Sequence, residues 1–255
     1  MVRQGVVGFG IFVMMVGTAC GLSGGAETDS SAAEEPTEVP SLPVSINEGL
    51  ASLDSYRLTF TSDVYDSTSQ QRTVTTVDSA RDRATDASYT RTESLVTTDA
   101  EEVVSQSVEE QFALGNQLCA VSDGEAQSST VSATAQEMSD LMSQVVILQP
   151  LIENPVYVAD DVVNGVPVRT YTFELRSIGA ASEAEATRAD GTYSIAVDGE
   201  YLVQYRLDLE LRTGAEGDPE AEYTASSFDF SLEQVNQPVE IVFPPACEVA
   251  VPVEE

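Results

Sequence analysis

The segment Tyr-Leu-Val-Gln-Tyr-Arg-Leu-Asp-Leu-Glu-Leu, residues 201–211, alternates between apolar and polar side chains. Tyrosine, valine and leucine recur at every second position, with polar residues between them and Leu202 as the one exception. A strand sorts such residues onto two opposite faces, whereas an α-helix would spread the apolar ones around its circumference. The segment therefore predicts a β-strand with one buried face and one solvated face.

A second alternating segment, residues 192–197, stands just before it and carries Tyr193, Ile195 and Val197 on one side. Asp198-Gly199 joins the two segments. Asp-Gly between alternating runs is a strong hairpin signal, because glycine readily adopts the positive φ of a tight turn. We therefore expect an antiparallel hairpin here and a core built from antiparallel sheet.

The two-residue period recurs along the chain, with weaker alternation in places. Asn164-Gly165 is a second hairpin signature, and Gly115-Asn116 indicates a third. Residues 178–187 are rich in Ala and Glu and indicate a connection. Strands are predicted at residues 56–64, 72–77, 87–96, 103–110, 157–163, 166–175 and 223–232, with a short final strand at residues 239–243.

Two segments have the helical period instead. Residues 45–54 carry an apolar stripe at i, i+4 and i+7 and predict a short helix. Near Thr134 the period returns, with Met138, Leu141 and Met142 on one stripe that is expected to pack on the apolar face of the sheet. Two interpretations of this second helix stay open. It is either plain core packing or a lid over a cavity, because methionine adapts to irregular apolar contents.

The composition limits the partners. The 255 residues include 43 Asp and Glu against 11 Lys and Arg, which gives a formal net charge of −32. Every one of the basic residues is Arg. A chain this acidic repels phosphate backbones, so nucleic-acid binding is not expected. The acidity is interpreted as a solubility feature, because no Asp-rich calcium-loop motif supports calcium binding.

Missing residue types limit the chemistry. The chain has no His, so it lacks a Ser-His or Cys-His pair and an imidazole metal ligand. Without Lys it has no group that could form a Schiff base. Two carboxylates could still catalyse hydrolysis, but no spacing identifies such a pair. We therefore expect a non-enzymatic protein with no metal and no cofactor, and a carboxylate-based hydrolase is the alternative.

The N-terminus has the pattern of an export signal. Arg3 precedes an apolar run, residues 5–16, that is short for a membrane span and typical of a signal-peptide core. The run ends in small residues before Cys20, which resembles the lipobox of bacterial lipoproteins, although Gly17 stands where leucine is usual. The resemblance implies cleavage before Cys20 and its modification with acyl chains such as palmitate. An ordinary cleaved signal with a chance cysteine is the alternative.

Four segments are predicted in the domain organisation. Residues 1–19 form the signal peptide, residues 20–44 the acylated Cys and an acidic linker, residues 45–245 the folded domain, and residues 246–255 a tail. The linker is rich in Ser, Gly, Ala, Glu and Pro, and its carboxylates have no basic residue to pair with. Low hydrophobicity and charge of one sign favour an extended, disordered tether.

Two cysteines remain once Cys20 is acylated. An exported chain meets oxidising conditions, so Cys119 and Cys247 are expected to form a disulfide. Such a bond would tie the middle of the domain to its tail. Two buried free thiols are the alternative.

Two further segments carry a family resemblance. Residues 228–244 read Phe-Asp-Phe-Ser-Leu-Glu-Gln-Val-Asn-Gln-Pro-Val-Glu-Ile-Val-Phe-Pro, and residues 51–60 read Ala-Ser-Leu-Asp-Ser-Tyr-Arg-Leu-Thr-Phe. Together with Cys20 and the order of helix, meander, helix and meander, they resemble the LolA-like lipoprotein superfamily, which includes the mycobacterial LprG and LppX lipoproteins. The likeness covers most of residues 45–245 and lies in patterns, not in catalytic signatures.

The resemblance implies an α+β, mainly β fold. A curved antiparallel sheet, or half-open β-barrel, would have a few helices covering its concave apolar face, and that face would bind acyl chains of lipids or lipoproteins. No fixed catalytic residues come with the family. The acidity of this chain is a departure that disfavours an anionic lipid ligand.

The expected function is that of an exported, lipid-anchored, monomeric protein on the outer face of the cytoplasmic membrane, at the cell surface or in the periplasm. It would bind or shuttle an acylated lipid or lipoprotein in an apolar cavity. The alternative is a structural or interaction lipoprotein with a packed core and no ligand. Ten apolar residues are candidates to line the cavity, and they are equally the residues of a dry core: Met138, Leu141, Met142, Tyr171, Phe173, Tyr205, Leu207, Leu209, Phe228 and Phe230.

Overall fold

A computed structural model describes residues 46–115, 117–122, 125–130, 152–175, 184–199, 201–213 and 221–248. The chain divides into two units, Met1–Glu38 and Val39–Glu255, and every described residue belongs to the second. Cys20, Met138, Leu141 and Met142 lie outside the described residues. Within the described ranges, no helix is both long and apolar enough to cross a membrane.

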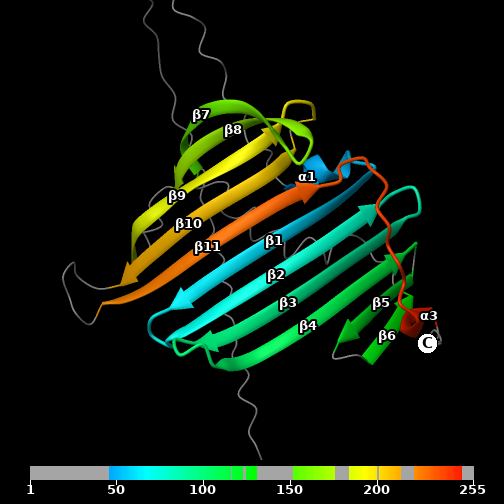
Figure 1. The fold of residues 1–255 in the computed structure, drawn as a ribbon, viewed down its shortest axis with the longest axis horizontal. Helices are drawn as coiled ribbons and strands as arrows, with labels where there is room; N and C mark the ends of the chain where they lie inside the picture. The colour runs from blue at the N-terminus through cyan, green and yellow to red at the C-terminus, as the bar shows by residue number, and fades with distance from the viewer. Residues whose placement is uncertain are drawn as a thin grey trace, which may run out of the picture. The chain divides into compact units, whose positions relative to one another are not determined.

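The described residues form one antiparallel sheet of 11 strands, with the order β6-β5-β4-β3-β2-β1-β11-β10-β9-β8-β7 (Figure 1). The two edges are β6 and β7, so the sheet is not closed. The pair of β1 and β11 joins a meander of the first six strands to one of the last five. The strands are β1 Ser55–Asp66, β2 Gln71–Asp82, β3 Ala87–Thr98, β4 Val103–Leu114, β5 Gln117–Ser122, β6 Glu125–Thr130, β7 Ile152–Val163, β8 Val166–Leu175, β9 Ala184–Ala196, β10 Leu202–Thr213 and β11 Glu222–Glu233.

Tight turns follow from the residues that the sequence places between the strands. Asn164 and Gly165 have φ of 53° and 82° and join β7 to β8. Two positive φ values suit the hairpin turn whose twist matches that of the strands, and Asn-Gly tolerates them best. Gly199, with φ of 93°, stands in the turn between β9 and β10. These two predicted hairpins are confirmed, and so is the third, because β4 and β5 pair antiparallel on either side of Gly115.

The main hydrophobic cluster lies on one face of the sheet, here called the apolar face. Cross-strand register puts Leu58 opposite Leu232 and Phe60 opposite Phe230 on β1 and β11, and all four side chains are buried. The other face, here called the polar face, carries the charged partners of the same strands, such as Arg57 and Asp78. One buried and one solvated face is the usual arrangement of antiparallel strands with alternating sequence.

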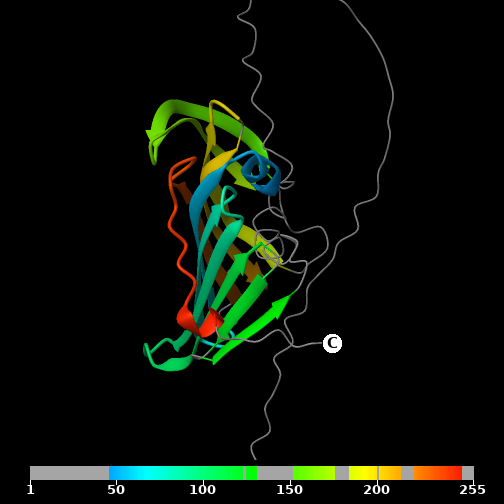
Figure 2. The same ribbon diagram turned by 90° about the vertical axis from the view of Figure 1, so that its right-hand side faces the viewer.

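A short helix, α1 (Ile46–Ala51), lies at one end of the apolar face (Figures 1 and 2). Leu50 and Leu53 join the core cluster. Arg83 holds the end of the helix, because its Nε donates to the Leu53 carbonyl at 2.6 Å and its Nη2 to the Leu50 carbonyl at 3.3 Å. Gly49 allows a close approach to the sheet, since a Cβ there would lie 2.6 Å from the Tyr201 Cβ.

The chain after β11 departs from the prediction. Residues 238–244 pair with no strand, so the final strand predicted at residues 239–243 is wrong. The segment runs along the side of the sheet opposite to α1 (Figure 2). Val239 is buried, and the ring of Phe243 lies 5.7 Å from that of Phe112 on β4. Burial of single side chains, and not ladder hydrogen bonds, therefore holds this segment.

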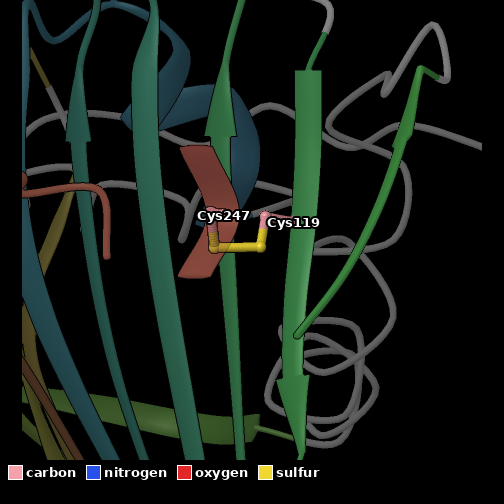
Figure 3. The surroundings of a disulfide bond; sticks show 2 residues. All are labelled: Cys119 and Cys247. Atoms are coloured by element: carbon pink, nitrogen blue, oxygen red, sulfur yellow. A yellow bond between two sulfur atoms is a disulfide. The ribbon is translucent and has the colours of Figure 1, made fainter. Parts of the chain in front are cut away.

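The segment ends in α3 (Pro245–Glu248), where Cys247 forms a disulfide with Cys119 of β5 (Figure 3). The Sγ atoms are 2.02 Å apart, and the two cysteines are separated by 128 residues. The expected pairing of the C-terminal part with the middle of the domain is present.

Two further details of the prediction change. β9 begins at Ala184, so the last part of the connection expected at residues 178–187 is a strand.

The pairing of β10 with β9 shifts register between Leu202 and Gln204, which marks a β-bulge. The bulge explains the exception at Leu202: both Leu202 and Val203 are buried, which a regular strand with two unlike faces would not allow. The fold is mainly β, and α1 is the described helix on the apolar face.

Candidate ligand-binding face

An aromatic row crosses six strands of the apolar face. In cross-strand register, each member stands opposite the next. The row reads Phe60 on β1, Phe230 on β11, Tyr205 on β10, Tyr193 on β9, Tyr171 on β8 and Tyr157 on β7. Direct cross-strand neighbours have side chains close enough to pack on one another. The aromatic row is therefore a continuous wall and not a set of separate contacts.

A second row supports the first. Leu207 on β10 stands opposite Phe228 on one side and Gly191 on the other, and Phe173 on β8 stands opposite Gly191. A Cβ at Gly191 would lie 2.5 Å from the Phe173 Cζ and 2.3 Å from the Arg206 carbonyl oxygen. The missing side chain thus leaves the space that the Phe173 ring occupies.

The rings meet in a compact cluster. Phe173 lies 5.6 Å from Tyr205 and 5.8 Å from Tyr193, and Tyr171 lies 5.1 Å from Tyr193, measured between ring centroids. These separations fall in the range in which aromatic pairs attract beyond their area burial. The orientation of each phenol ring is therefore held by its neighbours.

The structure brings all seven described candidates together on this face. Six are buried members of one cluster, and Phe228 is partly buried and packs against it. The six buried residues are Tyr171, Phe173, Tyr205, Leu207, Leu209 and Phe230. The candidates Met138, Leu141 and Met142 lie outside the described residues.

Two hydroxyl groups stand out in this otherwise apolar layer. The side chains of Tyr193 and Tyr205 are 1% and 2% exposed, and neither hydroxyl has a hydrogen-bond partner in the described part of the chain. Leaving a buried hydroxyl unpaired costs about 1–3 kcal/mol. Burial raises the pKa of Tyr193 to about 12 and also raises the pKa of Tyr205, so both phenols stay neutral donors at any physiological pH.

Sequence reasoning missed Tyr193 as a site residue. Its alternation with Ile195 indicated a buried position, but the cross-strand partner depended on the turn. An unbulged two-residue turn at Asp198-Gly199 would place Gln204 opposite Tyr193. The bulge after Leu202 moves the pairing by one residue and brings Tyr205 there instead.

The apolar face changes character along the sheet. The row that contains Phe228 continues through Ser62 on β1 to Thr75 on β2, Ser94 on β3 and Ser107 on β4. Most of these hydroxyl-bearing residues are only partly buried. The same face thus has an aromatic half on β1 and β7–β11 and a hydroxyl-rich half on β2–β4.

The polar face is a lattice of ion pairs. Arg57 pairs with Asp78 at 2.7 Å, Arg72 pairs with Asp63, and Arg188 bridges two carboxylates at 2.9 and 3.2 Å. An open hollow of about 480 Å³ on this face is lined by Val156, Thr172, Phe173, Glu174, Asp190, Gly191, Thr192, Arg206 and Asp208. Its charged, solvated lining does not suit an acyl chain, because burying hydrocarbon against ions leaves the ions without water.

No protein-family model and no curated protein matches the sequence. Among solved structures, lipoprotein LppX of Mycobacterium tuberculosis is similar over 77% of this chain and 93% of its own length, at 16% identity and a TM-score of 0.39. LprF of Mycobacterium bovis is similar over 78% of this chain and 93% of its own, at 13% identity and a TM-score of 0.38. LppX is one of the two mycobacterial lipoproteins that the resemblance in the sequence names.

Proposed function

We propose that this chain is an exported, lipid-anchored envelope protein that binds or shuttles an acylated lipid or lipoprotein on the apolar face of its sheet. Cys20 would carry the anchor, and residues 20–44 would hold the domain near the membrane. Several acyl chains on one residue give stable attachment, since one chain alone gives only marginal binding. The role is that of a carrier or receptor, not of an enzyme.

The observation that carries this proposal is the aromatic row with its two unpaired hydroxyls. An apolar face that crosses six strands has to be covered to keep its side chains from water. Among the described residues, the cluster takes four side chains from outside the strands: Leu50 of α1, and Leu53, Tyr201 and Val235 of loops next to strands. Apolar sites with a few convergent polar groups are the usual form of a lipid or small-molecule pocket. Tyr193 and Tyr205 provide such groups inside the apolar layer.

The finer arrangement belongs to the proposal as well. Helices, including the one predicted near Thr134, would cover the concave apolar face of a half-open barrel, with Met138, Leu141 and Met142 turned toward the ligand. The aromatic half would hold the acyl chains. The hydroxyl-rich half on β2–β4 would hold an uncharged polar head group.

The alternative function is a structural or interaction lipoprotein whose apolar face is filled by its own side chains. The observation in favour of it is the complete burial of Leu207 and Leu232, each 0% exposed. The two functions differ in one measurable respect, which is whether the protein takes up lipid.

The test is native mass spectrometry of the full chain, released from a detergent micelle after incubation with palmitate, methyl palmitate and phosphatidylcholine. We expect a complex with at least one of them. A matched pair of variants places the ligand: Leu207→Gln on the apolar face should abolish uptake, whereas Thr192→Gln on the polar face should not. Bare protein under every condition would favour the packed-core alternative.

A further inference from the structure

The two tyrosines with unpaired hydroxyls, Tyr193 and Tyr205, are cross-strand neighbours. They stand directly opposite each other on β9 and β10. Side chains in such a pair leave the sheet in the same direction from Cβ atoms about 5 Å apart. Phe173 contacts both rings, so the two phenols belong to one aromatic cluster.

Both hydroxyls lack an acceptor. They are buried, and no described residue accepts a hydrogen bond from either one. Other buried hydroxyls of the sheet are paired: Ser194 shares a hydrogen bond of 2.9 Å with Thr170, and Ser79 donates to the Tyr89 carbonyl at 3.0 Å. Buried polar groups in folded proteins are almost always paired, so two adjacent exceptions indicate a partner from outside the described chain.

The surroundings specify the charge of that partner. Burial is the cause of the raised pKa of Tyr205, and burial with the neighbouring Tyr171 is the cause for Tyr193; no charged group contributes to either. A carboxylate or phosphate placed here would therefore find donors but no described counter-charge, and a buried ion without one is strongly disfavoured. An uncharged oxygen has no such penalty.

We propose that Tyr193 and Tyr205 form a carbonyl-binding pair, which donates hydrogen bonds to the ester carbonyl of an uncharged acyl ligand. This rests on the proposed function and adds the chemical class of the ligand. The carbonyl oxygen has two lone pairs and accepts from both phenols. The acyl chain then lies on Phe173 and Leu207, which flank the two tyrosines on the apolar face. This site recognises an uncharged head and a carbonyl oxygen. An ionised fatty acid lacks the first, and a hydrocarbon lacks the second.

The experiment uses the full chain in detergent and three probes of matched chain length: methyl palmitate, palmitate and the corresponding alkane. Native mass spectrometry measures the bound fraction of each. Infrared spectroscopy of methyl palmitate with a ¹³C-labelled carbonyl measures whether that carbonyl accepts hydrogen bonds. The variants are Tyr193→Phe and Tyr205→Phe, singly and together. The control is Tyr223→Phe, which removes a hydroxyl from a tyrosine that is 42% exposed.

We expect methyl palmitate to bind more tightly than the other two probes, with its carbonyl band shifted to lower frequency. Each single variant should weaken binding of the ester about three- to ten-fold, the size of one hydrogen bond, and should leave binding of the alkane unchanged. The double variant should return the carbonyl band to its frequency in hydrocarbon, and Tyr223→Phe should change nothing.

Two results would overturn the inference. If the ester binds but the double variant alters neither its affinity nor its carbonyl band, the hydroxyls have another partner, such as water. The proposed function then stands, and the carbonyl-binding pair does not. If none of the probes binds to any version of the chain, both the pair and the proposed function are wrong. Circular dichroism of each variant verifies that the sheet is intact.

Discussion

At the scale of single residues, the chain treats buried polar groups in two ways. Most buried polar groups in the described sheet have a hydrogen-bond partner nearby. The Ser55 hydroxyl, for example, donates to the Gln237 carbonyl at 2.6 Å. Tyr193 and Tyr205 are not, although a phenylalanine at either position would bury the same ring without an unpaired hydroxyl. Two unpaired buried hydroxyls on cross-strand neighbours carry a cost that a dry core would avoid, and this cost is the basis of the proposed carbonyl-binding pair.

The buried phenols predict a stability change at high pH. Burial raises the pKa of Tyr193 from 10.0 to about 12, so the neutral phenol is favoured in the folded state. The resulting stability is complete below pH 10, the unfolded value, and is lost as the pH rises through the folded value. We expect the free energy of unfolding, measured in urea, to fall between pH 10 and 12, and to fall less steeply in the double Tyr193→Phe, Tyr205→Phe variant. Equal slopes for the two proteins would contradict this.

We expect Cys20 to be the residue through which the protein is attached to the membrane. If its thiol carries the anchor, Cys20→Ala should move the protein from the membrane pellet to the soluble fraction. The measurement is fractionation of cells that express each version. Ser23→Ala is the control, because it changes a nearby residue but leaves Cys20 and the disulfide intact. A Cys20→Ala protein that still pellets with membranes would contradict the lipobox interpretation.

At the scale of elements, the C-terminal segment is held differently from the strands. It crosses the sheet without ladder hydrogen bonds and is attached through Val239, the contact of Phe243 with Phe112, and the disulfide. The chain-entropy model gives a cross-link that spans 128 residues about 5 kcal/mol of stabilisation, because it restricts the unfolded chain.

We expect removal of the disulfide to lower the free energy of unfolding substantially. The double variant Cys119→Ser, Cys247→Ser should lose about 3–5 kcal/mol of unfolding free energy in urea. Reductant should destabilise the natural chain by a similar amount and leave the variant unchanged, which separates loss of the bond from effects of the serines. A variant as stable as the oxidised parent would show that the bond contributes nothing.

The edge strand β7 carries exposed apolar side chains, with Val156 61%, Tyr157 51% and Val158 55% exposed. Its pairing with β8 shifts register twice, between Glu153 and Val156 and between Tyr157 and Ala159. Bulges and charged residues on an edge strand oppose pairing with another chain. The monomeric state stays a prediction, and this irregular edge is in line with it.

At the scale of the whole molecule, charge is the dominant feature. A formal net charge of −32 makes the folded state repel itself, even though arginines of the polar face pair across strands. Salt screens this repulsion over about 10 Å at 0.1 M ionic strength. We expect the urea midpoint to rise as sodium chloride is raised toward 1 M, more than in an equally concentrated neutral osmolyte. A midpoint that falls with salt would show that the ion pairs outweigh the repulsion.

Much of the fold follows from local pattern. Alternation at residues 201–211 and the Asn-Gly and Asp-Gly turns predicted strands and hairpins that the structure contains, because side-chain period and turn chemistry are local properties. The strand expected at residues 239–243 is absent because strand formation also needs a pairing partner, which is not a local property. Its alternation is that of a strand, but ladder pairing needs a free neighbour edge, and both sides of β11 are already occupied by β1 and β10.

The sequence by itself determined a mainly β chain, its hairpins, its acidity and the residues that could form an apolar wall. Only the tertiary structure decided which of those residues face one another. The bulge after Leu202 sets Tyr205 against Tyr193, and the absence of a side chain at Gly191 lets Phe173 lie against both. Register and close approach depend on contacts between strands, and a pattern along one strand carries no record of its neighbour.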